Sequence, residues 1–242
     1  MYQIFSKCLK MSVFALIFFV FACKTDTKSP QNATATAVQT PANPLEMAPE
    51  LSQASANFTN LAELKGDLDG DQNPEMIVVF DTKKSGEFGT TRELHLYKQV
   101  GEKWRLWQKS VGPVLPSEHG GTKGDPFYKL EIKNKGIEIQ QNGGSGTQWS
   151  YIHRYEYVNN EWILTMANIT VSTACRIDHF DYNTLLGEIV VSRSDGMCDS
   201  EDPPQPKTYK MTRKVETPYK MDGFATGEHE VKFPQLKETY YF

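Results

Sequence analysis

The chain has 242 residues and a formal net charge of −4 at pH 7, from 26 basic and 30 acidic residues. A negative charge without clustered Lys and Arg argues against a nucleic-acid partner, because such a partner requires a basic surface. Hydrophobic residues make up 39% of the chain and aromatic residues 12%, which is enough for one domain with a substantial core.

The first segment has the layout of a secretory signal peptide. Lys7 and Lys10 precede an apolar run over residues 11–22, which ends on the small residue Ala22. A basic start, a short apolar stretch and a small residue at the cleavage point are typical of such signals. The run is too short for a membrane-spanning helix, which needs about 20 residues. We therefore predict a signal peptide over residues 1–22.

Cys23 directly follows the small residue, and this order resembles the signal of bacterial lipoproteins. In that family the signal is cut before the cysteine, which then carries fatty acyl chains such as palmitate. The resemblance implies that Cys23 is a lipid attachment site and that the protein is anchored in the cell envelope. Lys24, where inner-membrane lipoproteins have Asp, implies the outer membrane, at its periplasmic face or the cell surface. Phe21 is bulkier than the usual residue, and a plain signal peptide cut elsewhere is the alternative.

Residues 23–57 are predicted to form a disordered tether. This segment is rich in Ala, Thr, Gln, Pro and Ser and has no apolar period of either 2 or 3.6 residues. It therefore lacks the apolar surface that would offset the entropy cost of ordering. A short apolar stretch over residues 45–51 is the part that would dock as a helical turn. Without residues 1–22 the chain keeps 24 basic and 30 acidic residues, a net charge of −6.

Residues 58–242 are predicted to form a single β-rich domain. Apolar and polar residues alternate in segments separated by Gly, Asn and Pro, which indicates half-buried antiparallel strands. The short links KNKG and VNNE predict hairpins. We expect an all-β fold in which antiparallel hairpins and meanders form a sandwich or a partial-propeller-like domain. The predicted strands span residues 75–81, 92–99, 103–111, 127–133, 136–141, 147–158, 161–171, 187–193 and 208–214.

The clearest chemical motif is the sequence GDLDGDQNPE before the first predicted strand. Asp67, Asp69 and Asp71 alternate, and Asn73 and Glu75 continue the spacing. Hard cations such as Ca²⁺ bind six to eight oxygen ligands, and carboxylates held so close repel one another without a cation. We predict a calcium site formed by these five residues, with the backbone carbonyl of Asn73 as one ligand. The alternative is a solvated acidic turn.

The same stretch resembles the calcium loop of FG-GAP or VCBS-type β-propeller repeats. Those loops run Gly-Asp-x-Asn/Asp-Gly-Asp-Gly-x-x-Asp and continue into an apolar strand. The resemblance implies a structural calcium ion, and it departs at Gln72, which replaces Gly, and at Glu75, which replaces Asp. More loosely, stretches such as GEFGTTREL and FDYNTLLGEIVV resemble uncharacterised bacterial lipoproteins with one such loop. That likeness implies no activity.

Cys175 and Cys198 are expected to form a disulfide, because an exported chain enters an oxidising compartment. In the chain-entropy model, closing a loop of this length stabilises the fold by about 3 kcal/mol. The alternatives are a metal pair or a redox pair, which usually have closer Cys spacing.

No catalytic set is apparent in the sequence. Ser145 lacks the second Gly of a nucleophile elbow, the His residues show no zinc spacing, and residues 178–181 are expected to form a turn. The Trp residues are expected to pack in the core, with a sugar-stacking surface as the alternative. We expect a non-enzymatic, calcium-stabilised domain that binds a protein or glycan partner at the envelope. The alternative is an envelope hydrolase whose catalytic residues converge only in three dimensions.

Overall fold

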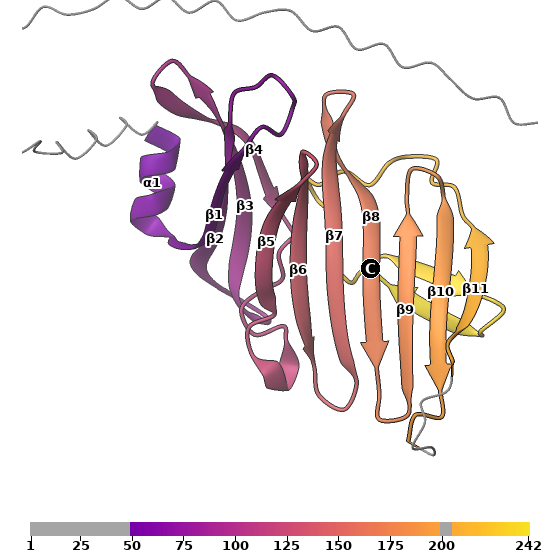
Figure 1. Ribbon diagram of the computed structural model, residues 1–242. Coiled ribbons are helices and arrows are strands. Elements are labelled where there is room, and N and C mark those ends of the chain that lie inside the picture. Colours follow the sequence, from indigo (N-terminus) through magenta and orange to yellow (C-terminus); the bar gives the residue numbers. More distant parts are fainter. Residues whose placement is uncertain (1–48, 199–204) are drawn as a thin grey trace, which may run out of the picture. The chain divides into compact units, whose positions relative to one another are not determined.

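A computed structural model describes residues 49–198 and 205–242 (Figure 1). The predicted signal peptide, Cys23 and the tether up to residue 48 lie outside the described residues. In the described part, no helix has the length and apolar character needed to span a membrane. The elements are α1 (Pro49–Asn57), a 3₁₀ turn (Gly121–Lys123), and strands β1 (Thr59–Gly66), β2 (Glu75–Gly86), β3 (Gly89–Val100), β4 (Lys103–Val111), β5 (Phe127–Lys133), β6 (Gly136–Gly144), β7 (Gln148–Val158), β8 (Glu161–Ser172), β9 (Arg176–Asn183), β10 (Glu188–Asp195), β11 (Lys207–Thr212), β12 (Glu230–Phe233) and β13 (Glu238–Tyr241).

The strands form two antiparallel meanders and a C-terminal hairpin. The sheets have the orders β1-β2-β3-β4 and β11-β10-β9-β8-β7-β6-β5, and β12 pairs with β13. One hydrophobic cluster contains side chains from both sheets and from the C-terminal segment, including Ile77, Tyr155 and Phe242. In Figure 1 the yellow C-terminal hairpin lies behind the seven-stranded sheet. The all-β, sandwich-like fold of antiparallel hairpins is thereby confirmed.

Two predicted hairpins are present with the expected turn residues. Asn134 and Lys135 link β5 to β6, and Asn159 and Asn160 link β7 to β8. All four residues have positive φ, between 47° and 65°, as a two-residue type I′ turn requires. Asn tolerates this region better than most residues, which is why these short links specify hairpins.

The structure places helix α1 in the last nine residues of the predicted tether. Leu51 and Ala54 are buried, and Phe58 packs beside them against the outer face of β2 and β3. These positions follow helical spacing only when Phe58, just beyond the predicted boundary, is included. Because α1 covers the outer face and the core covers the inner one, β2 is buried on both sides. This explains its continuous run of apolar residues.

Four strands were not predicted: β1, β9, β12 and β13. The expected turn at residues 178–181 is wrong, because this segment is the middle of β9. Asp178, Phe180 and Tyr182 alternate toward the core and are buried, so a buried carboxylate interrupts the apolar pattern. The four-residue strands β12 and β13 are too short to give a clear period.

Candidate metal site

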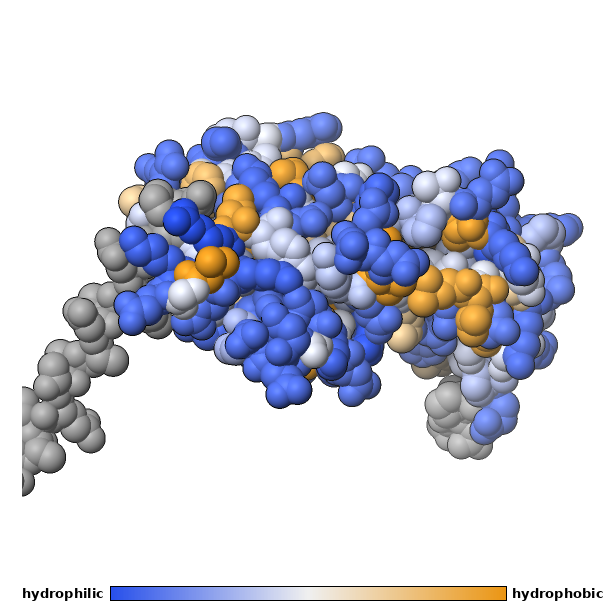
Figure 2. Space-filling view, turned by 90° about the horizontal axis from the view of Figure 1, so that it is seen from above, coloured by the Kyte–Doolittle hydropathy of each residue, from blue (hydrophilic) through white to orange (hydrophobic). Residues whose placement is uncertain are grey.

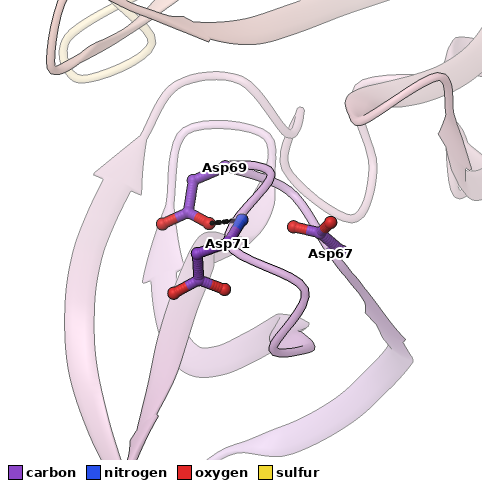
Figure 3. Close-up of side chains that lie close together, drawn as sticks. All are labelled: Asp67, Asp69 and Asp71. Atoms are coloured by element: carbon purple, nitrogen blue, oxygen red, sulfur yellow. Dashed lines mark hydrogen bonds between the residues drawn. The ribbon is translucent and has the colours of Figure 1, made fainter.

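The acidic loop joins β1 to β2 at the upper end of the strands in Figure 1. One carboxylate oxygen from each of Asp67, Asp69 and Asp71 can be chosen so that all lie within 4.8 Å of one another. Figure 3 shows the three side chains around the same turn. Within residues 49–198 and 205–242, this is the only group of three or more metal-ligating side chains so close together. The alternating spacing therefore does bring these three predicted ligands together.

The carboxylates also organise the loop backbone. Asp67 Oδ1 accepts a hydrogen bond from Gly70 N at 2.6 Å, and Asp69 Oδ1 accepts one from Asp71 N at 3.1 Å. Asp71 Oδ1 accepts one from Asn73 N at 2.7 Å. Such Asx turns are the usual reason that Asp is favoured in tight loops. For Asp67 and Asp71, the hydrogen bonds among the described residues leave Oδ2 open to another partner.

Gln72 adopts the conformation expected of the Gly that it replaces. Its φ is 72°, and that of Gly70 is 88°. Both values lie in the left-handed region, which favours Gly and costs other residues about 1 kcal/mol or more. The departure from the repeat consensus at position 72 therefore leaves the backbone turn in place.

Glu75 has a different position from the three aspartates. Its side chain is 1% exposed, and Oε2 accepts a 2.7 Å hydrogen bond from Leu68 N. Burial raises the pKa of Glu75, the hydrogen bond from Leu68 opposes this, and the charges of Asp69 and Asp71 add to the rise. Glu75 therefore supports the loop backbone from its buried side. It does not belong to the group of aspartate carboxylates that lie within 4.8 Å of one another.

Two lysines lie against the acidic loop. Lys98 of β3 forms an ion pair with Asp69 Oδ2, and its Nζ lies 4.0 Å from the centroid of the Trp107 ring. Partial burial works to raise the pKa of Asp69, but the hydrogen bond and charge of Lys98 and the backbone hydrogen bond from Asp71 N together outweigh it and hold the pKa below its usual value. A Cβ on Gly70 would lie 2.5 Å from Lys135 Nζ, so this second ammonium group also lies near the turn. A cation here would share Asp69 with Lys98 or displace it.

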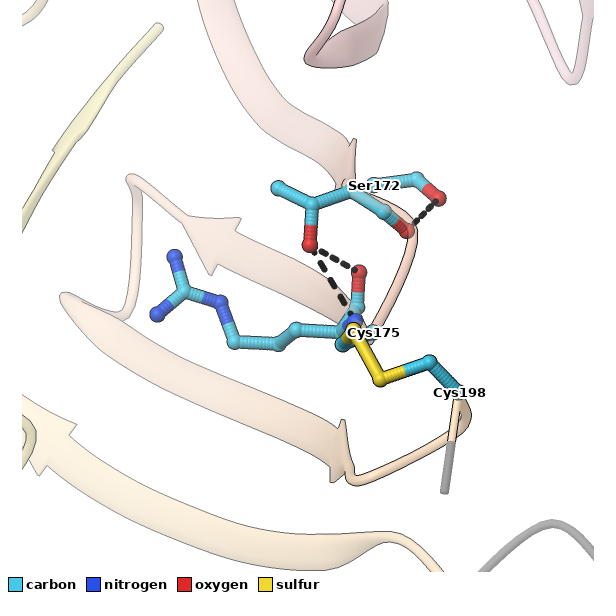
Figure 4. Close-up of a disulfide and its surroundings, with 5 residues drawn as sticks. Ser172, Cys175 and Cys198 are labelled. Atoms are coloured by element: carbon cyan, nitrogen blue, oxygen red, sulfur yellow. Dashed lines mark hydrogen bonds between the residues drawn. A yellow bond between two sulfur atoms is a disulfide. The ribbon is translucent and has the colours of Figure 1, made fainter. Parts of the chain in front are cut away.

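The predicted disulfide is present. Cys175 and Cys198 are joined, with their Cα atoms 4.6 Å apart (Figure 4). The bond links the turn before β9 to the segment after β10, and Met197 N donates a hydrogen bond to Cys175 O at 3.1 Å. The disulfide therefore closes the open end of the β9–β10 hairpin.

A buried polar chain under α1 was not predicted from the sequence. Glu93 Oε2 lies 2.8 Å from His95 Nε2, and His95 Nδ1 lies 2.9 Å from the Tyr97 hydroxyl. Lys109 Nζ lies 2.8 Å from Glu93 Oε1. Burial lowers the pKa of His95 despite the neighbouring carboxylate of Glu93. The alternating positions on one strand are the sequence signal that would have placed these side chains on one face.

A second unpredicted cluster connects β9, β10 and β13. Asp178 is 2% exposed and receives hydrogen bonds from Arg193 Nε at 2.7 Å and Nη2 at 2.6 Å. The Tyr240 hydroxyl donates a third hydrogen bond at 2.9 Å. A buried carboxylate needs such partners, but these partners are 15 and 62 positions away in the chain. No local sequence signal identifies them.

Comparison of the chain with known protein families, with curated proteins and with solved structures finds no match.

Proposed function

We propose that the protein is a lipid-anchored component of a bacterial cell envelope. Its β-domain binds a protein or glycan partner without catalysis and is stabilised by calcium in the loop before β2. The convergence of Asp67, Asp69 and Asp71 within 4.8 Å carries the calcium part of this proposal. Calcium selects oxygen ligands, and carboxylates on a tight loop supply the charge that it prefers. The ion offsets their mutual repulsion and so acts structurally.

The binding role is supported by exposed aromatic side chains, which are enriched at recognition surfaces. Tyr128 is 69% exposed, Tyr241 50% and Phe88 44%. Figure 2, which looks down on the upper end of the strands, shows a largely hydrophilic surface with scattered hydrophobic patches. Leu185 and Leu186, at the turn between β9 and β10, are also exposed. This face suits contact with partners through small sites rather than one large apolar interface.

Calcium is expected to raise the thermal midpoint of the protein. A ligand that binds only the folded state at 100 times its Kd stabilises it by about 2.7 kcal/mol. For a domain of this size, that corresponds to a rise of roughly 5–10 °C. Circular dichroism melting curves in calcium and in chelator measure the effect, with magnesium as the control for ionic strength. Superimposable curves would contradict the calcium site.

The lipid anchor is tested at Cys23. Cys23→Ser is expected to abolish labelling by a fatty-acid analogue and to move the protein from the membrane fraction to the soluble fraction, because acyl chains are what hold it at the membrane. Cys8→Ser, which changes a cysteine inside the predicted signal peptide, is the matched control. Labelling that persists in Cys23→Ser would remove the anchor from the proposal.

An envelope hydrolase is the second candidate, and the chain of Glu93, His95 and Tyr97 is the observation that favours it. A cavity of about 260 Å³ lies beside it, lined in part by Gln53, Glu93 and Lys109. However, both nitrogens of His95 already have partners, and Tyr97 is fully buried. This chain of residues therefore offers no free base that could accept the proton of an attacking group. Hydrolysis of p-nitrophenyl acetate or phosphate that is lost in His95→Gln would support this candidate.

A further inference from the structure

A cleft lies between the seven-stranded sheet and β13, beside the start of β7, the end of β8 and the start of β9. These strand ends are at the bottom of Figure 1, whereas the acidic loop is at the top. The volume of the cleft is about 250 Å³. Drug-sized ligands usually occupy pockets of about 300–1,000 Å³, so this cleft suits a smaller unit. The side chains that matter here are Trp149, Tyr151, Arg176, Glu238 and Tyr241, all of which line it.

The floor of the cleft belongs to a row of paired side chains, of which the three on β7, β8 and β9 line the cleft and the fourth, on β10, lies next to them. Trp149 of β7 is paired with Val171 of β8, Val171 with Asp178 of β9, and Asp178 with Arg193 of β10. Residues paired in this way project from the same face of a sheet. The sheet therefore presents an aromatic group, an aliphatic group and an ion pair side by side.

Aromatic residues line the cleft on both the sheet side and the hairpin side. On the sheet side, Trp149 lies so close to Gly143 that a Cβ at this glycine would come within 2.3 Å of the indole ring. Its ring centroid is 4.9 Å from that of Tyr151. On the hairpin side stands Tyr241, while its neighbour Tyr240 stacks on Phe180 at 4.9 Å and holds β13 against the sheet.

Balanced charges form the polar end of the cleft. Arg176 Nη1 donates to Glu238 Oε1 at 2.8 Å, and Arg193 pairs with the buried Asp178. Two guanidinium groups thus face two carboxylates, which leaves no net charge to attract an ionic ligand. Among the described residues, the hydrogen bonds of Arg176 and Glu238 leave Arg176 Nη2 and Glu238 Oε2 open. One open donor and one open acceptor therefore remain in a fixed arrangement.

The disulfide lies beside this polar end. Cys175 directly precedes Arg176, and the turn is closed by hydrogen bonds from Thr173 N to Arg176 O at 2.8 Å and from Arg176 N to Thr173 Oγ1 at 3.2 Å. Because Cys198 ties this turn to the end of β10, the backbone that carries Arg176 is fixed on both sides. A guanidinium group carried on such a constrained backbone favours specific recognition of a ligand.

We propose that this cleft binds one ring of a neutral saccharide. The apolar face of a sugar ring packs on Trp149 and Tyr241, as apolar surfaces pack on aromatic rings generally. Its hydroxyl groups, which both donate and accept, pair with Glu238 Oε2 and Arg176 Nη2 through charge-assisted hydrogen bonds. This inference deepens the proposed function and rests on it, since it selects a glycan as the partner.

Titration of saccharides into the full chain tests the cleft. The probes are N,N′-diacetylchitobiose, cellobiose, maltotriose and lactose, with digalacturonic acid as the charged comparison, followed by tryptophan fluorescence and saturation-transfer NMR. We expect at least one neutral probe to bind and the charged probe to bind more weakly. Tyr241→Ala should weaken binding on the order of tenfold by removing one stacking partner. Val111→Ala, which shortens a similarly exposed apolar side chain on β4 outside the cleft, should leave it unchanged.

The outcomes separate the cleft from the wider binding role. Saccharide binding that survives Tyr241→Ala supports a glycan partner but overturns the cleft as its site. Binding of the charged probe alone, or of none of the probes, also overturns the inference. In that case a protein partner that binds the purified full chain would still support the proposed function. Because Tyr241 is half exposed, its replacement leaves the core intact, and a melting curve of the variant verifies the fold.

Discussion

Individual carboxylates in the loop before β2 have different tasks, although the sequence presents them as one alternating series. Asp67 and Asp71 each use one oxygen to hold the backbone and leave the other open to a cation. Asp69 is already paired with Lys98. Glu75 is buried beneath the loop and holds Leu68 N. The spacing of the acidic residues predicts that they lie on one loop, but it does not distinguish a metal ligand from a residue that only supports the loop backbone. The difference depends on which side of the turn each side chain faces.

Substitutions at Glu75 distinguish a residue that supports the loop from a metal ligand. Glu75→Gln keeps an oxygen for Leu68 N, so we expect stability to change little and calcium affinity to remain within about threefold. Glu75→Ala leaves a buried N–H without a partner, which should cost about 1–3 kcal/mol of unfolding free energy. Urea denaturation measures the stability, and calorimetry measures calcium affinity. A loss of calcium binding in Glu75→Gln as large as in Asp71→Asn would instead make Glu75 a ligand.

At the scale of elements, the strands with local signals were predictable and those defined by distant contacts were not. The strands β4 and β5 have the predicted bounds, Lys103–Val111 and Phe127–Lys133, because alternation and turn residues mark both of their ends. Strand β9 was missed because its buried Asp178 is compensated by Arg193 and Tyr240. The extent of helix α1 was not predicted, beyond a helical turn expected within residues 45–51, because its apolar face becomes complete only against β2 and β3.

The cleft and the polar chain under α1 also differ in whether their residues are brought together by local or by distant contacts. Residues at alternate positions of one strand, such as Glu93, His95 and Tyr97, share a face, and the sequence is sufficient to predict this. The contact between Glu238 on β13 and Arg176 on β9 could not be predicted in this way, because these residues are 62 positions apart in the chain. Tertiary packing of the C-terminal segment creates the site.

At the scale of the whole molecule, the C-terminal segment completes the core shared by the two sheets. His153 of β7 is 0% exposed and lies 5.2 Å from the Phe224 ring of this segment. Burial, together with the charge of His229, lowers the pKa of His153 to about 3. The unfolded chain, in contrast, protonates an ordinary His near pH 6.5. Acid therefore favours the unfolded chain, which binds the proton that the folded core excludes.

Stability should consequently decrease as the pH falls from about 6.5 toward 3. Between about pH 6.5 and pH 5, above the range of ordinary carboxylates, His153 alone should reduce the free energy of unfolding by about 2 kcal/mol. His153→Leu should reduce the slope in this part of the profile, to which the lowered pKa values of His95 and His229 also contribute because both are desolvated by burial. His179→Asn, at an exposed position of β9, is the control variant. Urea denaturation at a series of pH values measures the slope. An unchanged slope in His153→Leu would mean that other groups control the acid response.

Calorimetric titration of Ca²⁺ into the full chain tests the calcium-stabilised domain most directly. We predict one binding site in the wild type and a large loss of affinity in Asp71→Asn, which removes a charge but retains an acceptor for Asn73 N. Asp222→Asn, which neutralises an exposed aspartate outside the loop, should bind as the wild type does. The absence of any binding heat at several temperatures, or equal affinities in the two variants, would contradict the account.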